Sequence, residues 1–176
     1  MTSTANVLCI DIGGDTVKAG CAASTQPLVI PNCTATLKFT QRFVADEISK
    51  IPNKKGFNYK RSLDRGYLVN TETQADVFSR LFTPSARGGL GVGTGSMSDS
   101  VVAVTEPPVP IPSLQAELDA MMFETFGIKK FFRAPAALFA ALHHMYAQYD
   151  QVPLSHSTSS SSNSGARSIS SFVPQS

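Results

Sequence analysis

The pattern of apolar and polar positions predicts strands at the start of the chain. Residues 5–12 (ANVLCIDI) form a nearly continuous apolar run, which predicts a strand buried on both faces. Gly13, Gly14 and Asp15 then supply a turn, so residues 16–22 can return as an antiparallel strand. Residues 27–33 (PLVIPNC) predict a third strand, which Pro31 and Asn32 should end.

Helical spacing appears after residue 70. The sequence TETQ predicts a capping box of Thr71 and Gln74, and a short amphipathic helix is expected over residues 71–82. A second helix is expected from Ser113 to a closing Gly127. Its apolar stripe, expected in the core, comprises Leu114, Leu118, Met121, Met122 and Phe126.

A third helix is expected from about Arg133, with Pro135 in its first turn. Its alanine-rich body (AALFAAL) can pack closely on neighbouring elements. His143 and His144 near its end point in different directions on a helix, which is typical of a surface pair rather than a metal site.

Residues 83–100 are rich in glycine and serine and predict a flexible surface insertion. Neither GxGxxG nor GxxxxGK[ST] occurs there. The segment is followed by a predicted strand (VVAVTEPP) instead of a helix whose N-terminus could hold phosphates, so we expect no phosphate site in it.

Composition indicates a globular body, because 42% of the 176 residues are hydrophobic and 16% are charged. The formal net charge of +2 favours neither a nucleic-acid binder by bulk electrostatics nor an acidic solvating protein. Residues 43–66 are polar and turn-rich, and we expect a solvated face there, with a nuclear-import or partner patch as the alternative. The positive charges of this segment are Lys54, Lys55, Lys60, Arg61 and Arg65.

The cysteines and the two ends of the chain bear on its location. Cys9, Cys21 and Cys33 form no CxxC pair, so reduced, buried thiols in an intracellular protein are expected. The N-terminus lacks a positive n-region and no run approaches a membrane span, which predicts a cytosolic or nuclear protein. We expect a domain over residues 1–150 and a disordered Ser-rich tail over residues 151–176.

Several motifs in one order resemble the actin family between residue 7 and about residue 142. IDIGGDTVKAG resembles the first phosphate loop of that superfamily, FVADEISK is similar to YVGDEAQSK, and RGYLVN to HGIVTNW. VTEPPVPIPSLQAELDAMMFETFG is the most specific match, to TEAPLNP followed by a helix ending in MFETF. The resemblance implies an α/β actin-like ATPase (ribonuclease-H-like) fold, first lobe only, with a mixed sheet and flanking helices. VIPNC and RGYLVN are most similar to the nuclear actin-related protein six subfamily.

The resemblance implies roles for several residues. Asp11 corresponds to the metal-side aspartate, Lys18 to the phosphate-contacting lysine, and Gly13 and Gly14 to the loop whose backbone approaches the phosphates. Asp15 replaces a glycine, and its carboxylate would repel phosphates unless it turns away. In place of the water-positioning glutamine stands Ala136. These residues imply no catalytic group and no metal site. They permit ATP in a full-length form, and imply weak or absent ATP binding by this chain, an N-terminal fragment without the second phosphate loop.

The subfamily resemblance implies a non-catalytic scaffold subunit of a nuclear chromatin-remodelling complex that exchanges a variant histone into nucleosomes. The implied partners are a motor ATPase, a zinc-finger protein and, indirectly, histones. The segment between Pro31 and Val44 is shorter than in actin, so filament formation is not expected. Two alternatives remain open at this point: a nucleotide-binding cytoskeletal actin-like protein, and a sugar-kinase-type enzyme of the same superfamily.

Overall fold

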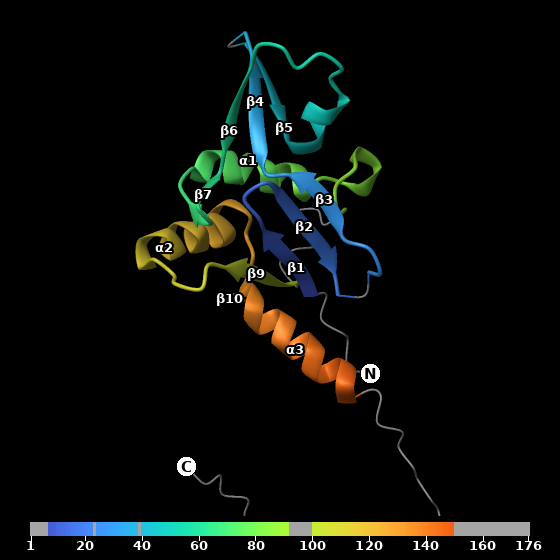
Figure 1. The fold of residues 1–176 in the computed structure, drawn as a ribbon, viewed down its shortest axis with the longest axis vertical. Coiled ribbons are helices and arrows are strands. Elements are labelled where there is room, and N and C mark those ends of the chain that lie inside the picture. Colours follow the sequence, from blue (N-terminus) through green and yellow to red (C-terminus); the bar gives the residue numbers. More distant parts are fainter. Residues whose placement is uncertain (1–6, 23, 39, 92–99, 150–176) are drawn as a thin grey trace, which may run out of the picture.

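The computed structural model describes residues 7–22, 24–38, 40–91 and 100–149. The predicted Ser-rich tail and residues 92–99 of the Gly/Ser-rich insertion lie outside these described residues, and residues Ser85–Arg87 of the insertion form a short 3-10 helix. Within them, a five-stranded mixed sheet forms the base of the molecule, and a smaller three-stranded sheet stands on it (Figure 1).

The five-stranded sheet has the order β10-β9-β1-β2-β3, and β1, β9 and β10 run parallel. Its strands are β1 (Val7–Ile12), β2 (Thr16–Cys21), β3 (Leu28–Pro31), β9 (Val101–Glu106) and β10 (Lys130–Pro135). The predicted strands are therefore confirmed over residues 7–12, 16–21 and 28–31 and after residue 100, and residues 5 and 6 lie outside the described residues. The β1–β2 hairpin places Asp11 opposite Lys18, because its register pairs Ile12 with Val17 across the turn.

The expected burial of β1 on both faces is wrong. Leu8 and Ile10 are buried in the core, whereas Cys9 on the other face is exposed. The expectation of buried thiols fails for the same reason, and Cys21 and Cys33 are only partly buried. Partial burial nevertheless raises the pKa of the Cys9 and Cys33 thiols.

The helix expected from about Arg133 begins later, at α3 (Ala136–Tyr149). Residues 130–135 instead form β10, because they pair in parallel register with β9. Pro135 therefore ends an edge strand and is not in the first helical turn. Most large apolar side chains of α3 do not pack closely on neighbours: Leu138, Leu142, Met145 and Tyr146 are exposed, whereas Phe139 is partly buried and its ring lies 6.0 Å from that of Phe132. No helix in the described residues is long and apolar enough to cross a membrane.

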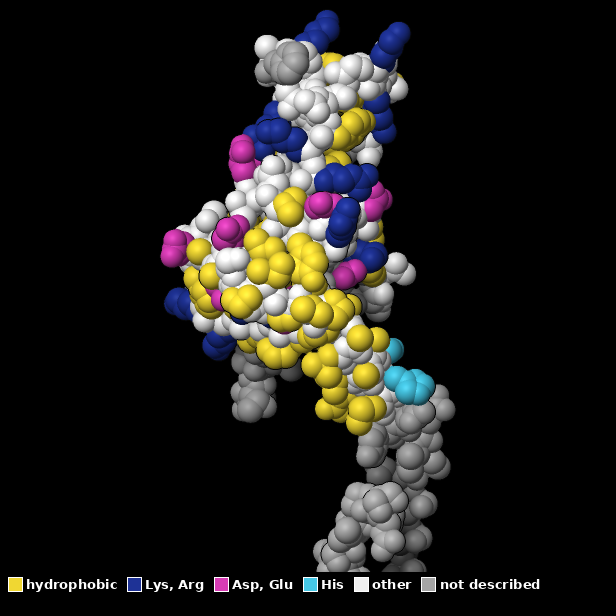
Figure 2. All heavy atoms as spheres, turned by 60° about the vertical axis from the view of Figure 1, so that its left-hand side comes forward, with side chains coloured by type: hydrophobic (Ala, Val, Ile, Leu, Met, Phe, Trp, Pro, Cys, Tyr) yellow, Lys and Arg dark blue, Asp and Glu magenta, His cyan; other side chains and the backbone are white. Residues whose placement is uncertain are grey.

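The polar segment 43–66, expected as a solvated face, contains one strand and the end of another strand of a second sheet, whose order is β5-β4-β6. Its strands are β4 (Cys33–Leu37), β5 (Gln41–Val44) and β6 (Phe57–Arg61), followed by the short hairpin β7 (Leu63–Asp64) and β8 (Tyr67–Leu68). Edge-to-face packing of Phe43 on Phe57, with centroids 5.5 Å apart, links the outer strands across β4. Lys and Arg side chains project from this part of the molecule in Figure 2.

Helix α1 (Thr71–Leu81) places Val77, Phe78 and Leu81 in the core, as its spacing predicts. The capping box of Thr71 and Gln74 is wrong, because Asn70 is the N-cap residue and accepts the N–H of Thr73 at 2.8 Å.

Helix α2 (Pro112–Ala120) begins one residue before the predicted start and continues into a π-helical turn, η4 (Met121–Thr125). Leu118, Met121, Met122 and Phe126 are buried, which confirms most of the predicted stripe, and Leu114 is partly buried. Gly127 closes the segment at a φ of 66°.

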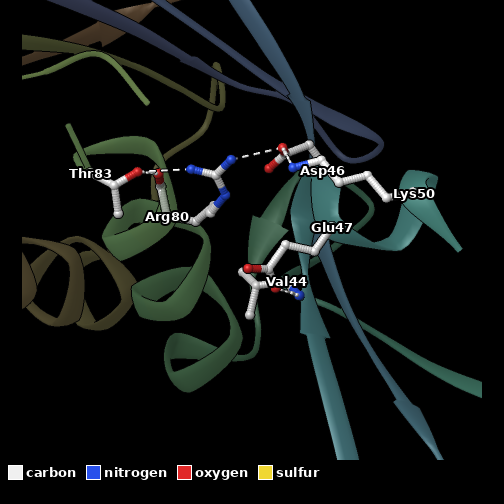
Figure 3. Close-up of polar contacts among 6 residues, drawn as sticks. All are labelled: Val44, Asp46, Glu47, Lys50, Arg80 and Thr83. Carbon is white, nitrogen blue, oxygen red and sulfur yellow. Dashed lines mark hydrogen bonds and ion pairs between the residues drawn. The ribbon is translucent and has the colours of Figure 1, made fainter. Parts of the chain in front are cut away.

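A charged cluster joins the small sheet to α1 (Figure 3). Asp46, in the 3-10 helix η1 (Ala45–Lys50), accepts hydrogen bonds from Arg80 at 2.8 Å and is 3.2 Å from Lys50. The Arg80 guanidinium also donates to Thr83 at 2.8 Å. Burial alone would raise the pKa of Asp46, but the hydrogen bonds from Arg80 and Lys50 hold that pKa below its usual value.

Candidate functional site

A cavity of about 380 Å³ lies at the carboxyl ends of the parallel strands β1, β9 and β10. In open α/β sheets this edge is where ligands bind. Of the site residues named from the sequence, Asp11, Gly13, Gly14 and Ala136 line this cavity together. Asp15 and Lys18 are not among its lining residues.

Asp11, at the end of β1, is held by two neighbours. Its carboxylate forms an ion pair with Lys18 at 2.9 Å and accepts the hydroxyl of Thr105 at 2.9 Å. The Thr105 Oγ1 also accepts the N–H of Ile12 at 3.0 Å, so one hydroxyl ties the end of β9 to the end of β1. Sequence reasoning did not single out Thr105. The available signal was its position, because Thr105 is a polar residue directly after the apolar run VVAV of β9.

The turn after β1 depends on a glycine at position 13. The Gly13 N–H donates to the carbonyl of Thr16 at 3.0 Å, and a Cβ added at Gly13 would lie 2.7 Å from that carbonyl oxygen. A Cβ at Gly14 would meet no atom within 4 Å among the described residues. The backbone of this turn is therefore open on the side of Gly14, and a phosphate could approach it closely.

The Asp15 carboxylate turns away from the cavity. It pairs with Arg61, at the end of β6, at a distance of 3.1 Å, and its side chain is 83% exposed. The same Arg61 nitrogen donates to the carbonyl of Gly14 at 3.1 Å. Thus the small sheet contacts the turn directly, an arrangement that the sequence did not indicate.

Two polar residues of the cavity lining, Glu106 and Gln115, were not singled out by sequence reasoning. Glu106 accepts the amide of Gln115 at 2.7 Å. Arg133, on β10, donates to the carbonyl of Gln115 at 3.1 Å and pairs with Asp119 at 3.1 Å. These contacts fix α2 over the ends of β9 and β10. Arg133 and Asp119 do not line the cavity themselves.

The apolar part of the cavity lining is extensive. It is formed mainly by Leu63 and Leu68 of the β7–β8 hairpin, Leu114 and Leu118 of α2, and the prolines of the loop that precedes α2. The hydroxyl of Tyr67 donates to the carbonyl of Val109 at 3.0 Å and thereby joins the hairpin to that loop.

We expect Thr105→Val to lower the free energy of unfolding by about 1–2 kcal/mol, because valine keeps the shape but loses both hydrogen bonds of the hydroxyl. Urea unfolding followed by circular dichroism measures the change. The control is Thr36→Val on β4, where the hydroxyl makes no hydrogen bond within the described structure. Equal losses in the two variants would contradict the role assigned to Thr105.

The mixed sheet, with an aspartate and a glycine turn after its first strand and a cavity at the ends of its parallel strands, defines an α/β protein whose cavity lies where ligands bind in such sheets. The model of the Actin family matches residues 2–152. The chain belongs to the actin family, and the expected actin-like α/β fold of the first lobe is confirmed.

The relatives found for the chain carry related names. Actin-like protein ARP6 of Cryptococcus neoformans is 35% identical over 139 residues, which cover 77% of this chain and 27% of the relative. Actin-related protein 6 of Arabidopsis thaliana is 31% identical over 156 residues, which cover 84% of this chain and 34% of the relative. The resemblance to actin-related protein six is thus confirmed, and the chain spans about a third of the length of these curated relatives.

Proposed function

We propose that the chain is a non-catalytic, actin-related scaffold subunit of a nuclear chromatin-remodelling complex that exchanges a variant histone into nucleosomes. The observation that carries this proposal is the position of Ala136. It follows β10, opens α3 and lines the cavity beside Asp11 and Gly13. Phosphoryl transfer to water needs a group that orients the water, and a methyl group can neither donate nor accept a hydrogen bond.

The turn after β1 fits the phosphate end of a nucleotide, because its backbone is open at Gly14. The turn of Gly13 and Gly14 would hold the phosphates. The Gly13 N–H already donates to Thr16, so the Gly14 N–H would bind the charge that ATP supplies. The charges of the neighbouring Asp11 and Asp15 are balanced by Lys18 and Arg61. No strong positive field therefore remains at the turn, which supports weak or absent ATP binding by this chain and leaves ATP binding to a full-length form.

An exposed apolar surface supports a partner-bound role. Figure 2 shows hydrophobic side chains along α3. Leu138 is 46% exposed, Met145 is 55% exposed, and Phe132 on the adjacent strand is 50% exposed. Apolar patches of this kind mark interaction surfaces.

For the complex we propose as partners a motor ATPase, a zinc-finger protein and, indirectly, histones. We propose neither membrane binding nor filament formation.

Two measurements on the full-length gene product test the proposal. We expect no ATP hydrolysis above that of a matched Asp11→Ala variant, because Ala136 cannot position water. We also expect tagged protein to recover a remodelling ATPase and the variant histone, identified by mass spectrometry. Hydrolysis that Asp11→Ala abolishes would contradict the non-catalytic part. Recovery of cytoskeletal proteins without a remodelling ATPase or histones would contradict the nuclear scaffold role.

A further inference from the structure

The backbone carbonyls of the turn after β1 are all bonded by groups from elsewhere in the chain. The side-chain Nδ2 of Asn32 donates to the carbonyl of Gly13 at 2.8 Å, and the backbone N–H of Asn32 donates to the carbonyl of Asp15 at 2.8 Å. Arg61 donates to the carbonyl of Gly14 at 3.1 Å. Each carbonyl of the turn is therefore drawn towards a donor on β6 or on the segment between β3 and β4.

Asn32 is the central residue of this arrangement. It follows β3, is 0% exposed, and bonds to two carbonyls of the same turn, one with its side chain and one with its backbone. Its Oδ1 has no hydrogen-bond partner within the described part of the chain. Burying the side-chain amide of Asn32 with an unpaired oxygen costs free energy. The hydrogen bond from Asn32 Nδ2 to the Gly13 carbonyl offsets only part of that desolvation cost.

Unlike the carbonyls, two of the backbone N–H groups of the turn have no partner within the described residues. In the described structure the N–H groups of Gly14 and Asp15 donate to no protein acceptor. An anion binds to a turn when successive N–H groups are free and the carbonyl oxygens, which would repel it, are directed elsewhere. The three bonds from Asn32 and Arg61 produce this separation of donors from acceptors.

We propose that Asn32 is a positioning residue for phosphate: it fixes the carbonyls of Gly13 and Asp15 so that the Gly14 and Asp15 amides stay available to the phosphate end of a nucleotide. This inference rests on the proposed phosphate role of the turn and extends it to a residue that does not itself line the cavity. Arg61 completes the clamp and connects it to the small sheet, since the guanidinium stands at the end of β6.

The experiment compares the wild-type chain with Asn32→Ala and with the near-isosteric Asn32→Asp, which cannot donate to Gly13. Asn58→Ala, an exposed asparagine of β6, is the matched control. Titration with pyrophosphate is followed through the backbone amide signals of residues 13–16 in ¹H–¹⁵N spectra, at a temperature where circular dichroism shows each variant folded. We expect pyrophosphate to shift the Gly14 and Asp15 signals in the wild type and in Asn58→Ala, with a weak affinity on the order of millimolar that agrees with the weak nucleotide binding proposed above. We expect its affinity to fall at least about tenfold in both Asn32 variants.

A second readout needs no ligand. In Asn32→Ala the amide signals of Gly14 and Asp15 should move and the hydrogen exchange of the Gly13 amide, which donates to Thr16, should accelerate, while the signals of α1 remain in place. A merely structural role would instead lower global stability and leave the pyrophosphate affinity of the folded protein unchanged, which would overturn the inference. If the wild type itself gave no response to pyrophosphate, both the inference and the phosphate role would fail. The scaffold role would stand, because it is tested separately by partner recovery.

Discussion

Replacing Phe78 by alanine should lower the free energy of unfolding by about 3–5 kcal/mol, the largest loss expected from a single substitution in this chain. Phe78 is 0% exposed and its ring lies 5.8 Å from that of Phe82 and 6.1 Å from that of Phe126. The phenyl group therefore joins α1 to the end of the α2–η4 segment. Alanine would leave a cavity at this junction, which the surrounding helices could fill only in part. Urea unfolding followed by far-ultraviolet circular dichroism measures the loss.

A matched control is Phe132→Ala, because Phe132 is 50% exposed and has one aromatic neighbour, Phe139, at 6.0 Å. Phe132→Ala should lower the free energy of unfolding by about 1 kcal/mol or less. Similar losses for the two substitutions would mean that α1 does not pack on the η4 end of α2 as the structure shows. Since loss of the Phe78 ring affects the core, its variant should also bind a hydrophobic dye at urea concentrations where the control does not.

Asp46→Asn should lower the free energy of unfolding by about 2 kcal/mol at pH 7, because the substitution leaves the largely buried Arg80 guanidinium without its anionic partner. The Asp46 side chain is 27% exposed and that of Arg80 is 9% exposed, so solvent screens this pair only partly. Urea unfolding of the wild type and the variant across a pH series measures the difference.

The sign of the pH dependence follows from the lowered pKa of Asp46. A carboxylate with a lower pKa in the folded state stabilises the fold fully above its unfolded pKa, about 3.9. That stabilisation is lost as the pH falls through the folded pKa. The advantage of the wild type over Asp46→Asn should therefore be constant from pH 7 to about pH 5, and shrink below about pH 4. An advantage independent of pH down to pH 2 would contradict the pairing.

Glu72→Gln is the control for this series. Its pKa is also lowered, by the hydrogen bond from Arg42 at 2.9 Å, but the Glu72 side chain is 68% exposed. Water and salt screen such a pair, so the change in stability should be much smaller than that of Asp46→Asn. The contrast distinguishes the contact between η1 and α1 from an ordinary surface ion pair.

Local patterns in the sequence were sufficient for several elements. Three predictions rest on spacing within a short window, and each element was found. They are the strands on both sides of Gly13 and Gly14, the helix at 71–82 and the apolar stripe ending at Phe126. The wrong predictions occurred where local pattern is ambiguous. Residues 130–135 (KFFRAP) mix aromatic and charged side chains and precede an alanine-rich helix, and only their pairing with β9 made them a strand. Asn70 replaced Thr71 as the N-cap because the chain before α1 is extended at Asn70.

The candidate site divides in the same way. Asp11, Gly13, Gly14 and Ala136 could be named from the sequence and its family resemblance, because they stand in contiguous motifs, and they line one cavity. The residues that hold this site together could not. Thr105 is 94 positions from the Asp11 carboxylate that it contacts, and Arg61 is 47 positions from the Gly14 carbonyl to which it donates. Sequence periodicity carries no information about such pairs, because strand order and register decide which distant residues meet.

The amino-acid sequence thus specified the glycine turn after the first strand and the family to which the chain belongs, since both reside in short, ordered motifs. Tertiary structure alone decided that Asp15 turns to Arg61, that Asn32 holds the carbonyls of the turn, and that α3 stays exposed. The physical reason is that hydrogen bonds and burial depend on which elements pack together. Packing is a property of the whole folded chain.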